Sequence, residues 1–211
     1  MSPPLLHPFT CMVAGPTGSG KTRWTFQLIE NAQTMIEPPP QSIVYCYGVY
    51  QHLFDQYRRY VNFHQGLPDV NSFDGRRRVL LIIDDLMSEV DDNVANIFTR
   101  GSHHKNISVV FLVQNMFHKN KHMRTISLNT HYMVLYRNVR DASQINALAR
   151  QMYPNNPSFL ISAYKQATDR AWGYLLLDFR GQTSEELRVR TNIFPGESHF
   201  VFVPETTHRQ K

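Results

Sequence analysis

The sequence predicts an α/β fold with a central, mainly parallel sheet of five strands, flanked by helices and extended by C-terminal edge strands. Short apolar runs recur along the chain, and several of the segments between them carry apolar residues at helical spacing. Strands that are apolar throughout are buried on both faces, which is typical of a parallel sheet that helices cover on both sides.

Length and composition point to one folded unit. The 211 residues suit a single domain at 9–204 between short tails at 1–8 and 205–211. A content of 42% hydrophobic and 18% charged residues is typical of a globular protein. The longest apolar runs, at 79–83 and 109–113, are too short to span a bilayer, and no stretch resembles a signal peptide. We therefore expect a soluble, intracellular protein. The net charge of +5 permits an acidic partner such as nucleic acid without requiring one.

The first elements surround a glycine-rich segment. A strand is predicted at 9–14, and a helix follows with apolar residues close to i, i+4, i+8 spacing, namely Trp24, Leu28, Ala32 and Met35. The proline triplet at 38–40 is expected to stop this helix. A second strand is predicted at 43–47, with a possible short strand near 61–64.

The same alternation continues to the C-terminus. Further strands of the parallel sheet are predicted at 79–83, 107–113 and 132–136. Helices are predicted at 94–100, 142–152 and 159–167, with Asp141 placed to cap the second of them. Late apolar stretches at 172–179, 187–194 and 200–203 are expected to form an antiparallel edge.

The glycine-rich segment matches the phosphate-loop pattern G-x-x-x-x-G-K-[ST] at every fixed position. Its residues are Gly15, Pro16, Thr17, Gly18, Ser19, Gly20, Lys21 and Thr22. Glycines let consecutive backbone N–H groups face the phosphates, and the following helix adds its positive end. Lys21 is expected to reach the β- and γ-phosphates of ATP, and Thr22 to offer its hydroxyl to Mg²⁺. The predicted fold is then a P-loop NTPase of the additional-strand, RecA-like type.

Polar residues end the two neighbouring strands. Asp84 and Asp85 follow the strand at 79–83, where Asp84 is expected to bind Mg²⁺ and Asp85 to polarise the attacking water. Asp85 is shorter than the glutamate that most such enzymes use, so Glu89 is an alternative base. Gln114 ends the strand at 107–113 and could sense the γ-phosphate or hold the attacking water.

Basic residues outside this edge have two interpretations each. Arg100 could reach the phosphates of a neighbouring subunit and stabilise transition-state charge, or it could be an ordinary surface arginine. Lys119, Lys121 and Arg124 could track a DNA phosphate backbone, or they could belong to a solvated loop.

Several of these segments together resemble the FtsK/HerA superfamily. The segments are GPTGSGKT at 15–22, LIIDD at 81–85 and RGSHHKNISVVFLVQ at 100–114. Within that superfamily the sequence is most similar to the genome-packaging ATPases of poxvirus-like and Polinton/Maverick-type viruses and transposons. The segments at 124–132 and 136–138 also resemble that group, and the likeness covers roughly 9–204, nearly the whole chain.

This resemblance implies a function beyond ATP hydrolysis. It implies that Lys21 and Thr22 hold phosphate and metal, that Asp84 and Asp85 are metal ligand and base, and that Gln114 is the sensor. It also implies that Arg100 is an arginine finger acting in trans. The implied assembly is a hexameric or pentameric ring that threads double-stranded DNA into a capsid within a host cell. The residues by themselves lead only to an ATPase.

Two other functions stay open at this point. A nucleotide-kinase-type phosphotransferase would share the phosphate loop, although such enzymes usually need a mobile lid rich in arginine. A non-catalytic nucleotide-dependent interaction protein is the other alternative. The intact Lys21, Thr22 and Asp84 argue against it, while the short side chain of Asp85 leaves it open.

Overall fold

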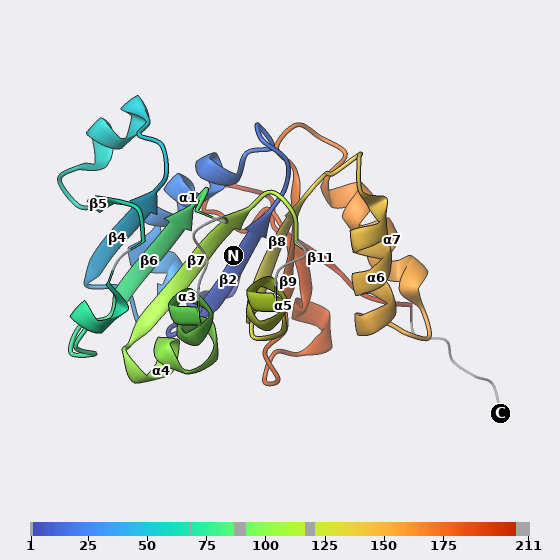
Figure 1. The fold of residues 1–211 in the computed structure, drawn as a ribbon. Coiled ribbons are helices and arrows are strands. Elements are labelled where there is room, and N and C mark those ends of the chain that lie inside the picture. The colour runs from blue at the N-terminus through green and yellow to red at the C-terminus, as the bar shows by residue number, and fades with distance from the viewer. Residues whose placement is uncertain (1, 68, 87–91, 117–120, 206–211) are drawn as a thin grey trace.

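The computed structural model describes residues 2–67, 69–86, 92–116 and 121–205. Within these residues the main sheet has the strand order β11-β10-β9-β8-β2-β7-β6-β4-β5 (Figure 1). Its strands, in chain order, are β2 Thr10–Ala14, β4 Ser42–Tyr47, β5 Asn62–Gln65, β6 Val79–Asp84, β7 Ile107–Val113, β8 Tyr132–Tyr136, β9 Tyr174–Asp178, β10 Val189–Thr191 and β11 Phe200–Phe202.

The sheet divides into a parallel region and an antiparallel edge, as predicted. Strands β5, β4, β6, β7, β2 and β8 pair in parallel. Strands β9, β10 and β11 continue the sheet in antiparallel pairing. The short strand β5 lies beyond β4 and widens the parallel region past the five strands predicted. Strand β7 lies between β2 and β6, which is the additional-strand order.

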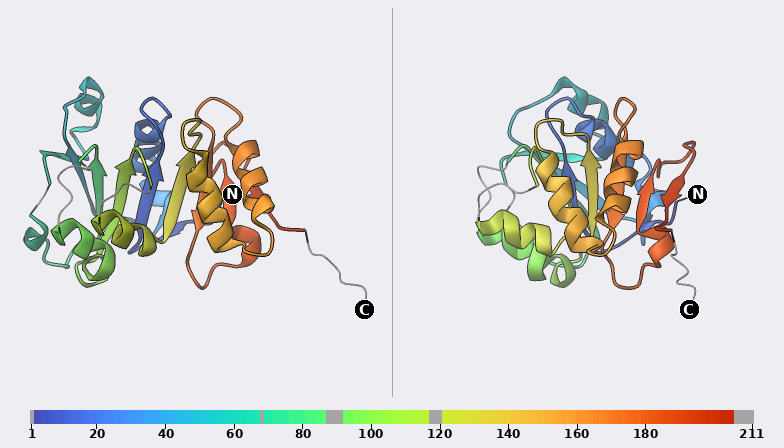
Figure 2. Two further views of the ribbon diagram at one scale, coloured as in Figure 1. Left: turned by 45° about the vertical axis from the view of Figure 1, so that its right-hand side comes forward. Right: turned by 90° about the vertical axis from the view of Figure 1, so that its right-hand side faces the viewer.

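Helices cover both faces of the sheet (Figures 1 and 2). They are α1 Lys21–Glu30, α2 Ala32–Met35, α3 Asp92–Asn96, α4 Ser102–His104, α5 Lys121–Leu128, α6 Ala142–Met152 and α7 Pro157–Ala167. Apolar residues of α1 and α2 pack in one core cluster, and those of α3, α5, α6 and α7 pack in the other. The sheet therefore separates two cores.

Strand β7 shows why the central strands read as continuous apolar runs. Successive side chains of a strand point to opposite faces. Val109, Phe111 and Val113 enter the core beneath α3 and α5, whereas Val110 and Leu112 enter the core beneath α1. All of β7 is buried, so both faces favour apolar residues, and the one serine, Ser108, is hydrogen-bonded to His7.

The structure corrects the predicted helix after the phosphate loop. The helix is interrupted at Asn31, whose side-chain amide donates to the Gln27 carbonyl at 2.9 Å. Strand β3 (Ile36–Glu37) then precedes the prolines and pairs in parallel with β1 (Leu5–Leu6). The proline triplet therefore follows a strand rather than ending the helix.

Two other local predictions were only partly right. The predicted helix at 94–100 consists of α3 followed by a π-helical turn, Ile97–Gly101. Asp141 precedes α6, but its carboxylate makes no capping bond to the helix backbone. Instead it accepts hydrogen bonds from the side chains of Ser143 and Gln144, which satisfies the carboxylate locally.

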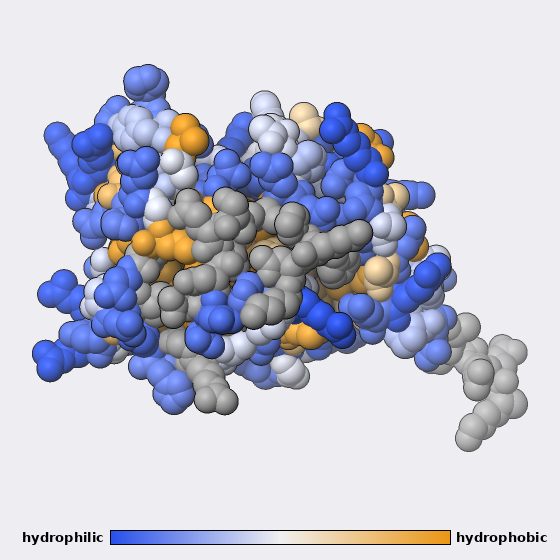
Figure 3. Space-filling view, in the orientation of Figure 1, coloured by the Kyte–Doolittle hydropathy of each residue, from blue (hydrophilic) through white to orange (hydrophobic). Residues whose placement is uncertain are grey.

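The surface in the view of Figure 3 is mostly hydrophilic, with scattered apolar residues. Among the described residues, none of the helices combines the length and the apolar character that a bilayer-spanning segment needs.

Candidate nucleotide-binding site

The predicted site residues lie at the carboxyl edge of the parallel strands. The phosphate loop follows β2, Asp84 ends β6, and Gln114 follows β7. Ala14 is level with Val113 in the sheet, and Asp84 is level with Leu112. The strand order thus places the loop, the carboxylates and the amide on neighbouring strand ends, where ligands of α/β sheets bind.

The phosphate loop is a tight turn between β2 and α1. The backbone N–H of Gly15 donates to the Val113 carbonyl at 3.1 Å, and that of Ser19 donates to the Pro16 carbonyl at 3.2 Å. Gly20 precedes α1 with φ of 110°, a conformation that favours glycine. The first backbone N–H groups of an α-helix have no acceptor within the helix, so those at the start of α1 are available to bind an anion.

Gly15 is required for a different reason. A Cβ atom at this position would lie 2.6 Å from the Cβ of Tyr136 and 2.7 Å from the Oγ of Ser19. Tyr136 ends β8, the strand on the other side of β2, and its hydroxyl donates to the Gly20 carbonyl at 3.2 Å. The tyrosine therefore holds the loop from the β8 side.

Lys21 begins α1 and turns back over the loop. Its Nζ donates to the carbonyl oxygens of Gly15 at 2.6 Å and Pro16 at 3.0 Å. Burial lowers the pKa of the Lys21 ammonium, and the negative charges of Asp84 and Asp85 oppose that shift. The cation is thus within electrostatic reach of both carboxylates.

Asp84 is a buried carboxylate with one hydrogen-bonded oxygen. It is 8% exposed, and its Oδ2 accepts the hydroxyl of Tyr45 at 2.6 Å. Burial raises the pKa of Asp84, the neighbouring Asp85 adds to that rise, and the Tyr45 hydrogen bond and Lys21 oppose it. A carboxylate and the Thr22 hydroxyl are oxygen donors of the kind that Mg²⁺ prefers, so this donor set fits the metal.

Asp85 adopts a left-handed backbone conformation, with φ of 55°. Such a conformation is uncommon for residues other than glycine, and aspartate tolerates it better than most. The side-chain amide of Gln114 donates to its Oδ1 at 3.4 Å. The turn thus aims Asp85 at the end of β7 rather than at the core. The alternative base, Glu89, lies outside the described residues.

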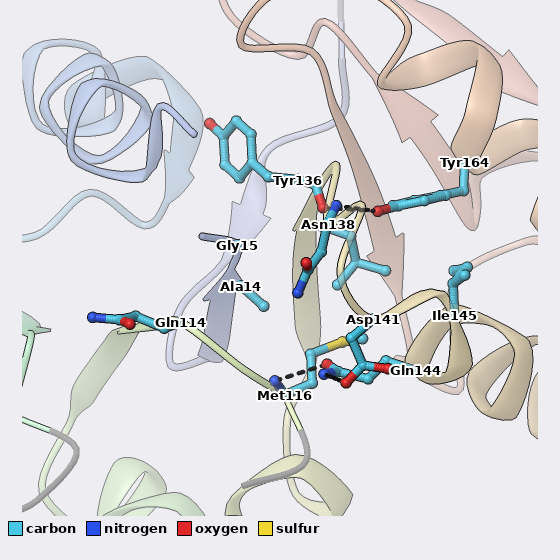
Figure 4. Close-up of a pocket in the computed structure, with 11 residues that line it drawn as sticks. Ala14, Gly15, Gln114, Met116, Tyr136, Asn138, Asp141, Gln144, Ile145 and Tyr164 are labelled. Atoms are coloured by element: carbon cyan, nitrogen blue, oxygen red, sulfur yellow. Dashed lines mark hydrogen bonds between the residues drawn. The ribbon is translucent and has the colours of Figure 1, made fainter. Parts of the chain in front are cut away.

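A small pocket opens beside Gly15, between the ends of β2 and β8 (Figure 4). The Asn138 side chain points into it, while the Asn138 backbone N–H bonds to the Tyr164 hydroxyl at 2.9 Å. The Met116 backbone N–H donates to the Gln144 side-chain oxygen at 3.1 Å, which ties the chain after β7 to α6. This pocket therefore borders the phosphate loop on the α6 side, and its wall combines polar and apolar side chains.

Three residues at this edge escaped prediction from the sequence. Tyr136 and Asn138 end and follow a strand adjacent to β2, so the rule that ligands bind at carboxyl strand ends could have found them. Tyr45 lies within β4, level with Ile82, where it reads as an ordinary apolar strand residue. Only the pairing of β4 with β6 brings its hydroxyl to Asp84.

Among the described basic candidates, the backbone of Arg100 lies away from this cluster. Arg100 lies in the turn Ile97–Gly101, before the amino end of β7, whereas Gln114 follows the carboxyl end. The seven residues of β7 span roughly 23 Å. Arg100 and the nucleotide edge of its own chain are therefore at opposite edges of the sheet. Arg124 is exposed on α5. Lys119 and the side chain of Lys121 lie outside the described residues.

No protein-family model matches this sequence, and no curated protein matches it significantly. Solved structures do match. The genome packaging NTPase B204 from Sulfolobus turreted icosahedral virus 2, in complex with ATP-gammaS, is 11% identical with a TM-score of 0.53, covering 93% of this chain and 97% of that one. Its complex with AMPPCP is 12% identical with a TM-score of 0.53, covering 94% and 98% respectively. The fold therefore resembles that of a viral genome packaging NTPase over nearly the whole length of both chains.

Proposed function

We propose that this protein is an ATPase that drives double-stranded DNA translocation during the packaging of a viral or virus-like genome. The observation that carries the proposal is the convergence of Lys21, the Asp84–Asp85 pair and Gln114 at one sheet edge, with β7 inserted between β2 and β6. The ATPase domain is proposed to be residues 9–204. The packaging role is supported by the fold likeness to a genome packaging NTPase.

The phosphate loop is proposed to bind the triphosphate of ATP. The backbone N–H groups of the loop and the amino end of α1 attract the phosphate oxygens, and the Lys21 ammonium supplies a full positive charge. Thr22 and Asp84 would hold Mg²⁺, which neutralises phosphate charge when bound. The Tyr45 hydroxyl fixes one oxygen of Asp84 and so orients the other.

Hydrolysis needs a positioned water and a sensor for the γ-phosphate. Asp85 is proposed to polarise the water, because its strained turn aims the carboxylate away from the core. Gln114 bonds to Asp85 and ends the strand next to the loop, so it is suited to respond to the γ-phosphate.

The ring and the DNA contacts belong to the same proposal. Arg100 is separated from its own site by the length of β7, so its proposed role requires the site of a neighbouring subunit in a hexameric or pentameric ring. Lys119, Lys121 and Arg124 are proposed to contact the DNA backbone, and capsid proteins are proposed partners. The net charge of +5 suits an acidic ligand.

The test is steady-state ATP hydrolysis with and without double-stranded DNA, over ranges of salt and protein concentration. We expect DNA to stimulate hydrolysis, salt to weaken the stimulation, and the specific activity to rise steeply with protein concentration. Lys21→Ala should abolish turnover because the phosphates lose their main side-chain charge. Normal turnover in that variant would refute the assignment of the phosphate loop. DNA-independent hydrolysis at every concentration would refute the motor.

A further inference from the structure

A large aromatic residue lies beside the phosphate loop without a role in the proposed chemistry. Trp172, in the connection from α7 to β9, is 57% exposed. Its backbone φ is 58°, in the left-handed region that a bulky residue rarely adopts. The Trp172 side chain is thus exposed to solvent even though its backbone conformation costs free energy.

The connection that carries Trp172 is tightly built. The backbone N–H of Gly173 donates to the Arg170 carbonyl at 3.0 Å. A Cβ on Gly173 would lie 2.4 Å from the Ala167 carbonyl oxygen. The Arg170 guanidinium also bonds to the side chain of Asn192. The indole is thus held on a fixed turn and not on a loose loop.

The indole rests on the start of α1. A Cβ on Gly20 would lie 3.1 Å from the Trp172 Cδ1 and 3.2 Å from its Cβ, so a side chain at this position would crowd the indole. The Arg23 guanidinium carbon lies 4.7 Å from the centre of the indole ring, within cation–π range. More than half of Trp172 is exposed despite these contacts, so ring surface stays open to a ligand.

Two hollows flank the ring, and both reach the phosphate loop. One, of about 220 Å³, has Gly20 and Arg23 in its wall. The other, of about 330 Å³, has Gly18 in its wall. Both hollows share Tyr136 and Trp172. A planar group attached to phosphates in the loop would have space on this side.

The strand order indicates which part of a bound nucleotide would lie near Trp172. The carboxylates and Gln114 follow β6 and β7, on one side of β2, and this is where the γ-phosphate would point. Tyr136 and Trp172 are associated with β8 and β9, on the other side of β2. The remainder of the nucleotide must leave the loop away from Gln114, and therefore towards Trp172.

We infer that Trp172 is a stacking platform for the base of the bound nucleotide. Arg23 lies over one face of the indole, so the base would stack on the other face, with Arg170 in the wall of the subsite. The inference rests on the proposed ATP site and adds a residue that discriminates a nucleotide from a bare phosphate chain. Every base has a π-face, so stacking on the indole adds affinity without selecting one base.

The first measurement uses the two tryptophans of the chain. Trp24 is 1% exposed although it borders one of the hollows, whereas Trp172 is open, so a base stacked on the ring should change chiefly the emission of Trp172. ATP should quench the tryptophan fluorescence of the wild-type protein, and the quench should vanish in Trp172→Phe, which keeps an aromatic ring. An equal quench in Trp172→Phe would overturn the inference.

The second measurement compares the binding of ATP with that of inorganic triphosphate, which has no base. Trp172→Ala should weaken ATP binding about tenfold and leave triphosphate binding unchanged, whereas Trp172→Phe should restore most of the ATP affinity. Tyr60→Ala is the matched control, because Tyr60 is 58% exposed and lies just before β5, the strand at the opposite side of the sheet from β8 and β9.

The outcomes separate this inference from the proposed function. Lys21→Ala should weaken the binding of both ligands. If the wild-type protein bound neither ligand, the proposed ATP site would fail. If Lys21→Ala lost both while Trp172→Ala bound ATP normally, only the stacking subsite would fail. An equal loss of ATP and triphosphate in Trp172→Ala would also overturn the subsite, because it would show that the residue merely shapes the loop.

Discussion

Two buried aspartates lead to opposite predictions when each is replaced by asparagine. Asp84 is 8% exposed, and its pKa is raised chiefly by burial, with the Tyr45 hydrogen bond opposing the shift. Asp178 is 4% exposed, but its Oδ2 lies 3.4 Å from the guanidinium of Arg190, which is itself 1% exposed. One carboxylate is thus buried without a full counter-charge, and the other belongs to an ion pair.

A carboxyl group whose pKa is raised by folding destabilises the folded state when it is ionised. Its stabilising contribution is full below the unfolded pKa and is lost as the pH rises through the folded pKa. Asp84→Asn removes the charge and keeps an oxygen for the Tyr45 hydroxyl. We expect it to raise the unfolding free energy of the metal-free, nucleotide-free protein by about 1 kcal/mol and the melting temperature by about 2–4 °C. Asp178→Asn leaves Arg190 buried without its counter-charge and should lower the unfolding free energy by about 3–5 kcal/mol.

The assay is urea unfolding of both variants and the wild type in a chelating buffer without nucleotide. The advantage of Asp84→Asn should be full at neutral pH and shrink as the pH falls towards the ordinary aspartate value of 3.8, because the wild-type carboxyl then becomes neutral as well. The same variant should lose ATP hydrolysis. Destabilisation by Asp84→Asn at neutral pH, of the size seen in Asp178→Asn, would refute the reasoning.

The other predictions concern the loop, the sensor and the neighbouring subunit. Gly15→Ala should lower the unfolding free energy by about 1–3 kcal/mol in urea titrations, because its Cβ would overlap a neighbour, whereas Gly181→Ala, with open space around it, should not. Gln114→Ala should slow ATP hydrolysis and leave ATP binding unchanged, since it removes the hydrogen bond to Asp85; weakened binding would contradict the sensor role. Arg100→Ala should also bind ATP without hydrolysing it, and mixing it with Asp85→Asn should restore activity at mixed interfaces. No recovery in assemblies shown to contain both variants would count against a shared site.

The fold was predictable because its central strands are all buried on both faces of the sheet, which requires mainly apolar sequences. Strands β7 and β8 have the predicted bounds, since a strand buried on both faces is apolar at nearly every position; the buried Ser108 of β7 has a hydrogen-bond partner in His7. Helix α6 was also predicted correctly, from the periodicity of its apolar face. The break at Asn31 was missed because the apolar spacing continues across it into α2.

The candidate site was predictable only where a local pattern carries it. The phosphate loop and Asp84 follow buried strands, and the rule for carboxyl strand ends brings them together. The Tyr45 hydroxyl reaches Asp84 only through strand pairing, which no short pattern encodes. Trp172 was read as the start of a strand, although it lies before β9 in a left-handed turn. Side chains that converge from distant segments require the three-dimensional arrangement.

The hydrogen bonds of the Lys21 ammonium have a consequence for the energetics of ligand capture. The ammonium donates to two carbonyl oxygens of its own loop, those of Gly15 and Pro16. An arriving phosphate must therefore compete with these internal acceptors before it gains the cation. Capture is therefore an exchange of hydrogen-bond partners and not a simple addition. The net affinity gained from the Lys21–phosphate contact is smaller than the charge alone would give, because the two loop carbonyls lose their donor.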